Sequence, residues 1–339
     1  MSMRSCVPFC AALLVLALGG MTAQPASGQA AGWTAPRTPD GHPDLQGVWA
    51  NNNVTPLERP EVLGDRATLT PEELAALQAR AGELFNSEAG DAAFGDSVFA
   101  AVLAEAQTFS SRDTATGNYN QFWMVDRDWD ARTSLVTDPP NGRLPGRTAA
   151  ADAVLATRAA ARQRHARGPE DRSLGERCIS WGVPRLGAGY NSYTQVFQSA
   201  DHVVLYMEMG GSRVIPLDAG PHVDDGIRQM HGDSRGHFEG DTLVIDTTNY
   251  STTGAFMGTS DGLHLVERLT RVAEDSLQYE VTVTDPKTWD ASWSAMVPLK
   301  RSTDPVFEYA CHEGNIGMDG IMTGARALEK AEGTAGGQN

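Results

Sequence analysis

The chain has 339 residues, of which 43 are acidic and 27 are basic, so its formal net charge is −16 at pH 7. An acidic surface of this kind repels phosphate backbones and anionic lipids, and the sequence has no basic stripe, so nucleic-acid and membrane partners are not expected. The length suits one large all-β domain with helical additions, or two domains.

The first 30 residues have the pattern of a secretory signal peptide. Arg4 provides a short positive region, and the apolar stretch from Cys6 to Leu18 is too short to span a membrane. Small residues then lead to a plausible cleavage site after Ala30, and loss of Arg4 would leave a net charge of −17. We therefore expect an exported protein, periplasmic or secreted, with no membrane insertion after cleavage.

Residues 31–46 are rich in proline and glycine and are expected to form an N-terminal arm. The first strand is expected at residues 44–49. Its Gly47-Val48-Trp49 triplet resembles the start of lipocalin barrels, in which the tryptophan plugs one end, although a core tryptophan on any strand would look the same.

Two helical insertions are expected, at about residues 70–107 and 149–167. The first begins with Thr70 followed three residues later by Glu73, the pattern of a capping box. Asp96 is expected to cap a second short helix in the same insertion. We expect these insertions to pack on the outside of the sheet or across its mouth.

The remaining segments alternate polar and apolar side chains with period two. In residues 263–272, for example, Leu265, Glu267, Leu269 and Arg271 share one face. Alternation shows which side chains share a face but not which face is inside. The expected strands cover residues 119–129, 132–137, 193–198, 202–209, 212–217, 233–238, 241–250, 263–272, 277–284, 293–300 and 306–312.

Short turns join most of these strands, as in an up-and-down antiparallel meander that closes into a barrel or folds over as a sandwich. The sequence therefore predicts a mainly β fold, a lipocalin-like antiparallel barrel with helical insertions. One barrel domain would span residues 47–330, ending in a short helix near residues 320–330 and a flexible tail at 331–339.

Signal cleavage would leave two cysteines, Cys178 and Cys311. In an oxidising compartment an even pair far apart in sequence suggests one disulfide, and two buried free thiols are the alternative. If the two residues pair, the loop at residues 177–191 is held beside His312 and Glu313.

That neighbourhood would suit acid–base chemistry. His312 would act as general acid or base with Glu313 to orient it, while Arg185 and Tyr190 would stabilise a developing oxyanion. The structural alternative makes His312 a satisfied histidine at a strand end and Glu313 a salt-bridge partner. The residues expected to bind substrate are Arg177, Trp181, Glu208, His222, Arg228 and His264.

The predicted function is binding, and transformation, of a small organic molecule in the barrel cavity by a cofactor-independent lyase, isomerase or hydrolase reaction. Whether the chain is an enzyme stays open at this point. The rivals are a non-catalytic carrier with the same cavity and a structural protein of the cell envelope.

Other chemistries have weaker signals. His222, His231 and His237 lie near several aspartates, and these side chains are of the types that bind zinc or calcium. They have no recognised ligand spacing, and an acidic solvent-exposed loop is the alternative, so no cofactor is predicted. The chain has no Gly-x-Ser-x-Gly elbow, phosphate loop or dinucleotide fingerprint.

Several long motifs together resemble a large family of exported, mostly uncharacterised proteins of environmental bacteria. The resemblance covers nearly the whole mature chain; it implies export and one shared fold and supplies no activity or catalytic residue. His231 departs from the pattern and therefore carries less weight as a site residue. The motifs are TPDGHPDL at 38–45, YNQFW at 119–123, DPPNGR at 138–143, GDSRG at 232–236 and YACHEGN at 309–315.

Overall fold

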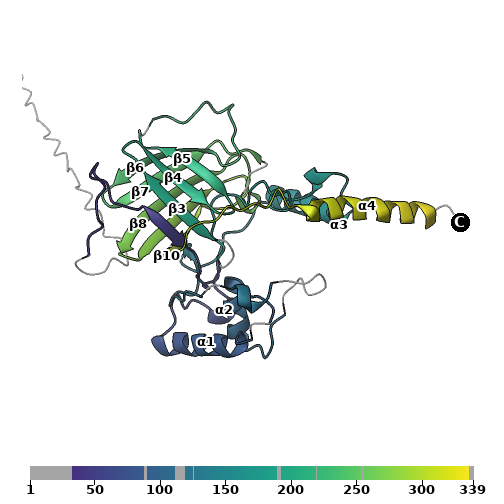
Figure 1. Cartoon of the computed structure of the whole chain (residues 1–339), viewed down its shortest axis with the longest axis horizontal. Coiled ribbons are helices and arrows are strands. Elements are labelled where there is room, and N and C mark those ends of the chain that lie inside the picture. The colour runs from purple at the N-terminus through teal and green to yellow at the C-terminus, as the bar shows by residue number, and fades with distance from the viewer. Residues whose placement is uncertain are drawn as a thin grey trace, which may run out of the picture.

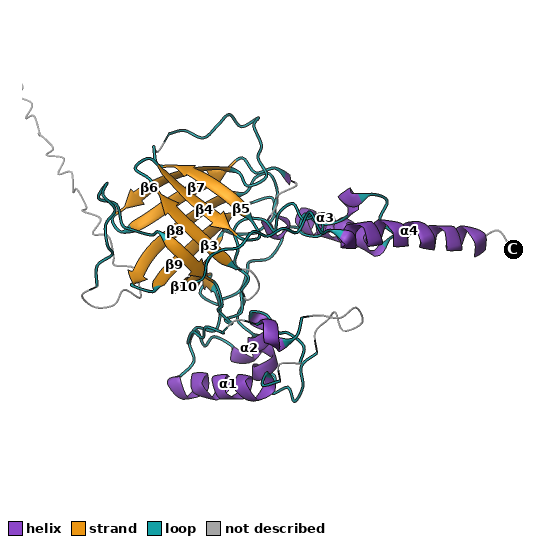
Figure 2. Ribbon diagram, in the orientation of Figure 1, coloured by secondary structure: helices purple, strands orange, loops and turns teal. Residues whose placement is uncertain are grey.

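The structure is a computed structural model in which the strands gather into one barrel and the helices lie outside it (Figure 1 and Figure 2). The expected signal peptide lies outside the described residues. Those residues are 33–87, 90–110, 119–124, 126–188, 192–218, 220–252 and 256–335.

Nine strands follow one another around the barrel in the order β5-β4-β3-β1-β10-β9-β8-β7-β6, and β2 also pairs with β10. Every hydrogen-bonded neighbour is antiparallel. The strands are β1 (Gly47–Ala50), β2 (Val136–Asp138), β3 (Tyr193–Gln198), β4 (His202–Met207), β5 (Gly211–Pro216), β6 (Asp233–Glu239), β7 (Thr242–Thr248), β8 (His264–Ala273), β9 (Ser276–Thr284) and β10 (Trp293–Ser302).

The two ends of this sheet meet at β5 and β6, which run parallel to each other because eight antiparallel pairings separate them. Their contact is close at Gly236, where an added Cβ would lie 2.8 Å from Cγ2 of Ile215. Glycine at this position lets β6 lie against β5. The result is a nearly closed antiparallel barrel, which confirms the predicted fold class.

Burial shows which strand faces point inward. On β8 the side chains of Leu265, Glu267, Leu269 and Arg271 are at most 4 % exposed, so this face lines the interior. The interior of the barrel therefore contains charged side chains, those of Glu267 and Arg271, as well as aliphatic ones.

One end of the barrel is filled by aromatic and charged side chains. The Trp49 indole N–H donates to the carbonyl of Leu45 at 2.9 Å. The Arg271 guanidinium lies 5.6 Å from the centre of the Trp49 ring and 5.8 Å from that of Trp33. It also donates to the carbonyl of Asp44 at 3.0 Å, which ties the N-terminal arm across this end.

Two expected strands are not formed. Residues 303–315 are loop and turn, so the strand expected at 306–312 is wrong. The physical reason is that β10 already has β9 on one side and β1 with β2 on the other, so no adjacent edge is left. The described residues among 119–129, which leave out 125, hold a 3₁₀ turn, Gln121–Trp123, and single bridges instead of a strand.

The first helical insertion contains α1 (Pro71–Leu84) and α2 (Asp96–Leu103). The capping box is confirmed, since Thr70 Oγ1 accepts from Glu73 N–H at 3.2 Å and Glu73 accepts from Thr70 N–H at 2.9 Å. The second helix is capped by Gly95, and Asp96 is its first residue, not its cap. The two helices bury a small core of their own, separate from the barrel core.

Helices α3 (Ala149–Gln163) and α4 (Ile316–Ala335) extend away from the barrel together (Figure 1). Helix α3 ends four residues before residue 167, the expected end of the second helical insertion. Helix α4 is longer than the helix expected at 320–330. Arg326 on α4 donates to the carbonyl of Arg167 at 3.1 Å, which links α4 to the segment that follows α3. No helix in the described ranges is long and apolar enough to cross a membrane.

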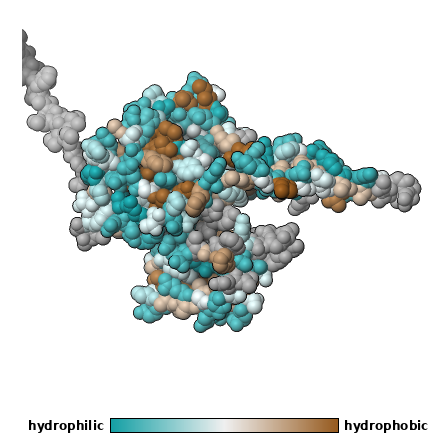
Figure 3. Space-filling model, in the orientation of Figure 1, coloured by the Kyte–Doolittle hydropathy of each residue, from teal (hydrophilic) through white to brown (hydrophobic). Residues whose placement is uncertain are grey.

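The outer face of β3, β4 and β5 carries an exposed apolar row. Phe197, Val204 and Val214 lie directly opposite one another across the three strands. Phe197 is 46 % exposed and Val214 60 %. Figure 3 shows brown, apolar surface over these strands.

Candidate functional site

A narrow cavity lies inside the barrel. The space open to the centres of water molecules is about 40 Å³, which is room for roughly three waters. Exposed Gly187 marks its mouth, and Trp49 lies at the filled end. Its apolar wall is made by Val196, Leu205, Met207, Met209, Leu269, Leu277 and Leu299.

A buried ion pair interrupts this apolar wall. Arg213 on β5 and Glu267 on β8 form two parallel hydrogen bonds, at 2.9 and 2.7 Å, and both side chains line the cavity. The Arg213 guanidinium also donates to Ser234 Oγ at 2.9 Å and to Thr247 Oγ1 at 3.1 Å. A bidentate arginine–carboxylate pair is the geometry that best compensates burial of two charges.

Tyr279 completes this cluster by donating its hydroxyl to Glu267 Oε1 at 2.6 Å. Burial, and then the charge of Glu267, raise the pKa of Tyr279, so it stays a neutral donor. Burial opposes the charge of Arg213, but the ion pair with Glu267 outweighs it and raises the pKa of Arg213. The cluster is therefore internally neutralised, and only Arg213 Nε is without a partner within the described residues.

The mouth is crossed by the segment of residues 177–188, here called the strap. The Cys178–Cys311 disulfide is present, as predicted, and ties the strap to the segment before α4. Asn51 donates its side-chain amide to the carbonyls of Leu186 and Gly187, at 3.1 Å each. The strap is thus tied at one end to the segment before α4 and held at the other end by Asn51, which follows β1.

Arg185 is the strap residue whose side chain reaches the cavity. Its guanidinium lies 6.0 Å from the centre of the half-exposed Trp181 ring. Burial lowers the pKa of Arg185, and the nearby charges of Tyr309 and Glu208 act against that shift. Burial also raises the pKa of Glu208, against the effect of Arg185. Of the expected site residues, Arg185 thus lies beside Trp181, and Glu208 is near enough to act on the charge of Arg185.

His312 and Glu313 are placed differently from their predicted position. Both side chains are exposed, on the turn after Cys311, and neither lines the cavity. Arg177 is half-buried beside the disulfide and also does not line the cavity. Tyr190 lies outside the described residues. The loss of the expected strand at 306–312 explains the difference, since a strand end would have carried His312 to the barrel rim.

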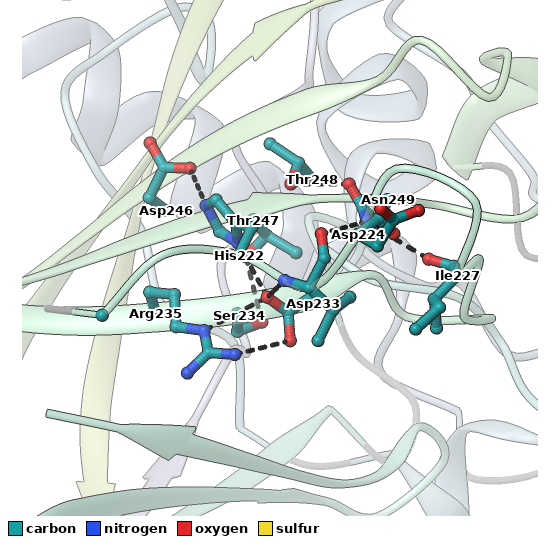
Figure 4. A network of polar contacts seen from close by, with 12 residues as sticks. His222, Asp224, Ile227, Asp233, Ser234, Arg235, Asp246, Thr247, Thr248 and Asn249 are labelled. Carbon is teal, nitrogen blue, oxygen red and sulfur yellow. Dashed lines mark hydrogen bonds and ion pairs between the residues drawn. The ribbon is translucent and has the colours of Figure 1, made fainter. Parts of the chain in front are cut away.

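Three other predicted substrate-binding residues lie on the outer face of the barrel. His222 contacts Asp233 through Nδ1 at 2.8 Å and Asp246 through Nε2 at 2.9 Å, as Figure 4 shows. His264 contacts the same Asp246 at 2.8 Å. Arg228 is exposed and donates to the carbonyl of Asp261 at 2.9 Å.

This outer network holds the loop of residues 220–232 against β6 and β7. Asn249 donates to the carbonyls of Val223, Asp224 and Ile227, and Arg235 contacts Asp233 (Figure 4). Burial opposes ionisation of Asp233, but hydrogen bonds from His222 and Arg235 hold its pKa below the usual range. No group of three or more His, Cys, Asp or Glu side chains among the described residues is arranged to hold a metal ion.

A second polar pair, besides Arg213 and Glu267, was not predicted. Ser180 Oγ lies 2.8 Å from Nε2 of His231 and accepts from the backbone N–H of Gly182 at 3.0 Å. Burial, and then the charge of Arg213, lower the pKa of His231. The two residues are 51 positions apart and belong to no motif, so only the folded chain shows that they meet.

The stability of the fold is expected to fall as pH drops below about 6.5, partly because of His231. A histidine in an unfolded chain takes up a proton near pH 6.5, whereas folding lowers the pKa of His231. The unfolded state then binds more protons, so the free energy of unfolding decreases until the folded-state pKa is passed. Urea unfolding at pH 7.5 and 5.5 should show a smaller pH effect in His231→Gln than in wild type. His237→Gln is the matched control, because that side chain is exposed; equal pH effects in all three proteins would contradict the expectation.

No protein-family model and no curated protein matches this chain. Among solved structures, the chain is similar to the crystal structure of a mutant of the fluorescent protein UnaG. The two are 16 % identical, the match covers 33 % of this chain and 72 % of that one, and the TM-score is 0.22. Values this low do not bear on function.

Proposed function

We propose that this chain is an exported protein that binds a small, mostly apolar organic molecule inside its barrel. The observation that carries the proposal is the internal cavity with an apolar wall and a few fixed polar groups, a combination typical of small-molecule sites. Neutralisation of Glu267 by Arg213 supports binding over acid–base chemistry at this cluster, because neither charge is free to accept or donate a proton.

Export accords with the disulfide and with the signal pattern of the first 30 residues. Membership of the exported family named above is part of the same proposal. Transformation of the ligand by His312 and Glu313 stays a prediction from the sequence, and their exposure is the reason for placing binding first.

A larger side chain in the wall of the cavity should weaken the binding of a small apolar molecule there. Thr194 lines the cavity on β3, while its neighbour Gln195 points outward on the same strand. Calorimetric titration with pentan-1-ol should show at least tenfold weaker binding in Thr194→Phe and wild-type affinity in Gln195→Phe. Equal affinities in both variants would place the alcohol elsewhere and remove the support for a barrel site.

A native mass spectrum of the protein, purified from the exported fraction of its host, would complement this titration. Retained mass in wild type that is absent from Thr194→Phe would identify the natural ligand of the cavity.

A further inference from the structure

The guanidinium of Arg185 gives the mouth of the cavity a positive charge. Within the described residues Arg185 makes no salt bridge, although it lies in a half-buried position that lowers its pKa. The second arginine of the cavity, Arg213, is neutralised by Glu267. Arg185 is therefore the positive charge that the cavity offers to an incoming molecule.

The guanidinium of Arg185, beside Trp181, suits a planar anion. Its guanidinium stands over the ring of Trp181, with 6.0 Å between the guanidinium carbon and the ring centre. The N–H groups of a guanidinium lie in its plane and can donate to an anion placed there. Two parallel N–H groups match the two oxygens of a carboxylate.

We propose that the ligand is a small monocarboxylic acid, with its carboxylate on Arg185 and its apolar body inside the barrel against Leu205, Met207 and Leu269. The proposal rests on the proposed function and adds the chemical class to it. The size of the cavity agrees with a short chain or a single ring, since the free space equals roughly three waters. A bulkier acid would need the strap to move.

A carboxylate near the mouth sets the specificity of this arrangement. Glu208 lies close enough to Arg185 to act on its charge. A ligand that carries a second carboxylate would meet Glu208, so monocarboxylates are favoured over dicarboxylates.

The test compares three five-carbon probes that differ in head group: pentanoate, pentan-1-ol and pentylamine. At pH 7 we expect wild type to bind pentanoate at least tenfold more tightly than the alcohol, and the amine most weakly. In Arg185→Gln the preference for pentanoate over the alcohol should disappear, while the affinity for the alcohol is kept. Arg301→Gln removes the same charge beside Gly47 at the filled end of the barrel and should keep the preference.

The outcomes separate this inference from the proposed function. Equal affinity for pentanoate and the alcohol in wild type would leave the barrel site standing and overturn the carboxylate assignment, as would tighter binding of the amine. A preference that survives in Arg185→Gln would overturn the role of Arg185. No binding of any probe would overturn both proposals.

Discussion

Replacing Arg213 by methionine is expected to lower the free energy of unfolding by about 3–5 kcal/mol. The substitution leaves the carboxylate of Glu267, which is 1 % exposed, without its counter-ion in the barrel interior. Breaking one side of a buried pair has this cost because the remaining charge stays desolvated. Urea unfolding monitored by circular dichroism would measure it.

Two further variants show whether the cost comes from the unpaired charge. Arg213→Met combined with Glu267→Gln should recover most of the lost stability, since no charge then remains in the wall. Arg268→Met removes a surface arginine that pairs with Glu239 from the outer face of β8, and should cost no more than about 1 kcal/mol. A loss in Arg213→Met as small as that in Arg268→Met would contradict a tightly buried pair.

Removing the disulfide is expected to have an effect of similar size. Cys178 and Cys311 are 133 residues apart, and closing a loop of that length stabilises by up to about 5 kcal/mol in the chain-entropy model. The double variant Cys178→Ser, Cys311→Ser should therefore unfold at a clearly lower urea concentration than wild type. It should also bind pentan-1-ol more weakly, because the strap loses its tie to the segment before α4.

Reduction of the wild-type protein provides the matched control. Dithiothreitol should shift wild type to the midpoint of the double serine variant and leave that variant unchanged. A double serine variant within about 1 kcal/mol of wild type would mean that the remaining contacts of the strap, such as those of Asn51, already hold it.

Local patterns in the sequence were sufficient for most strands of the sheet and for the first helix. The capping box at Thr70 and Glu73 predicted the start of α1, because the interactions that form it span only three residues. Strand β3 has the predicted limits, and β7 to β10 differ from theirs by a few residues at most. Period-two alternation predicts the limits of these strands well, because one face of each strand is buried.

Local patterns were misleading where a strand needs a neighbour. Residues 306–312 have a suitable composition, but both edges of β10 are occupied and the segment stays a loop. That single difference moved His312 and Glu313 from the expected barrel rim to the surface. The candidate site consequently shifted to Arg185, Trp181 and the cavity behind them.

The sequence by itself determined the residues that share each strand face, and it predicted the barrel class and the Cys178–Cys311 disulfide that the structure contains. Only the tertiary structure decided which face is inside. On β8 the face with Leu265 and Leu269 also carries Glu267 and Arg271, so hydrophobicity alone did not distinguish it from the opposite face. Glu267 is tolerated inside because Arg213, 54 residues earlier, meets it across the barrel, and a contact of that separation leaves no local signal.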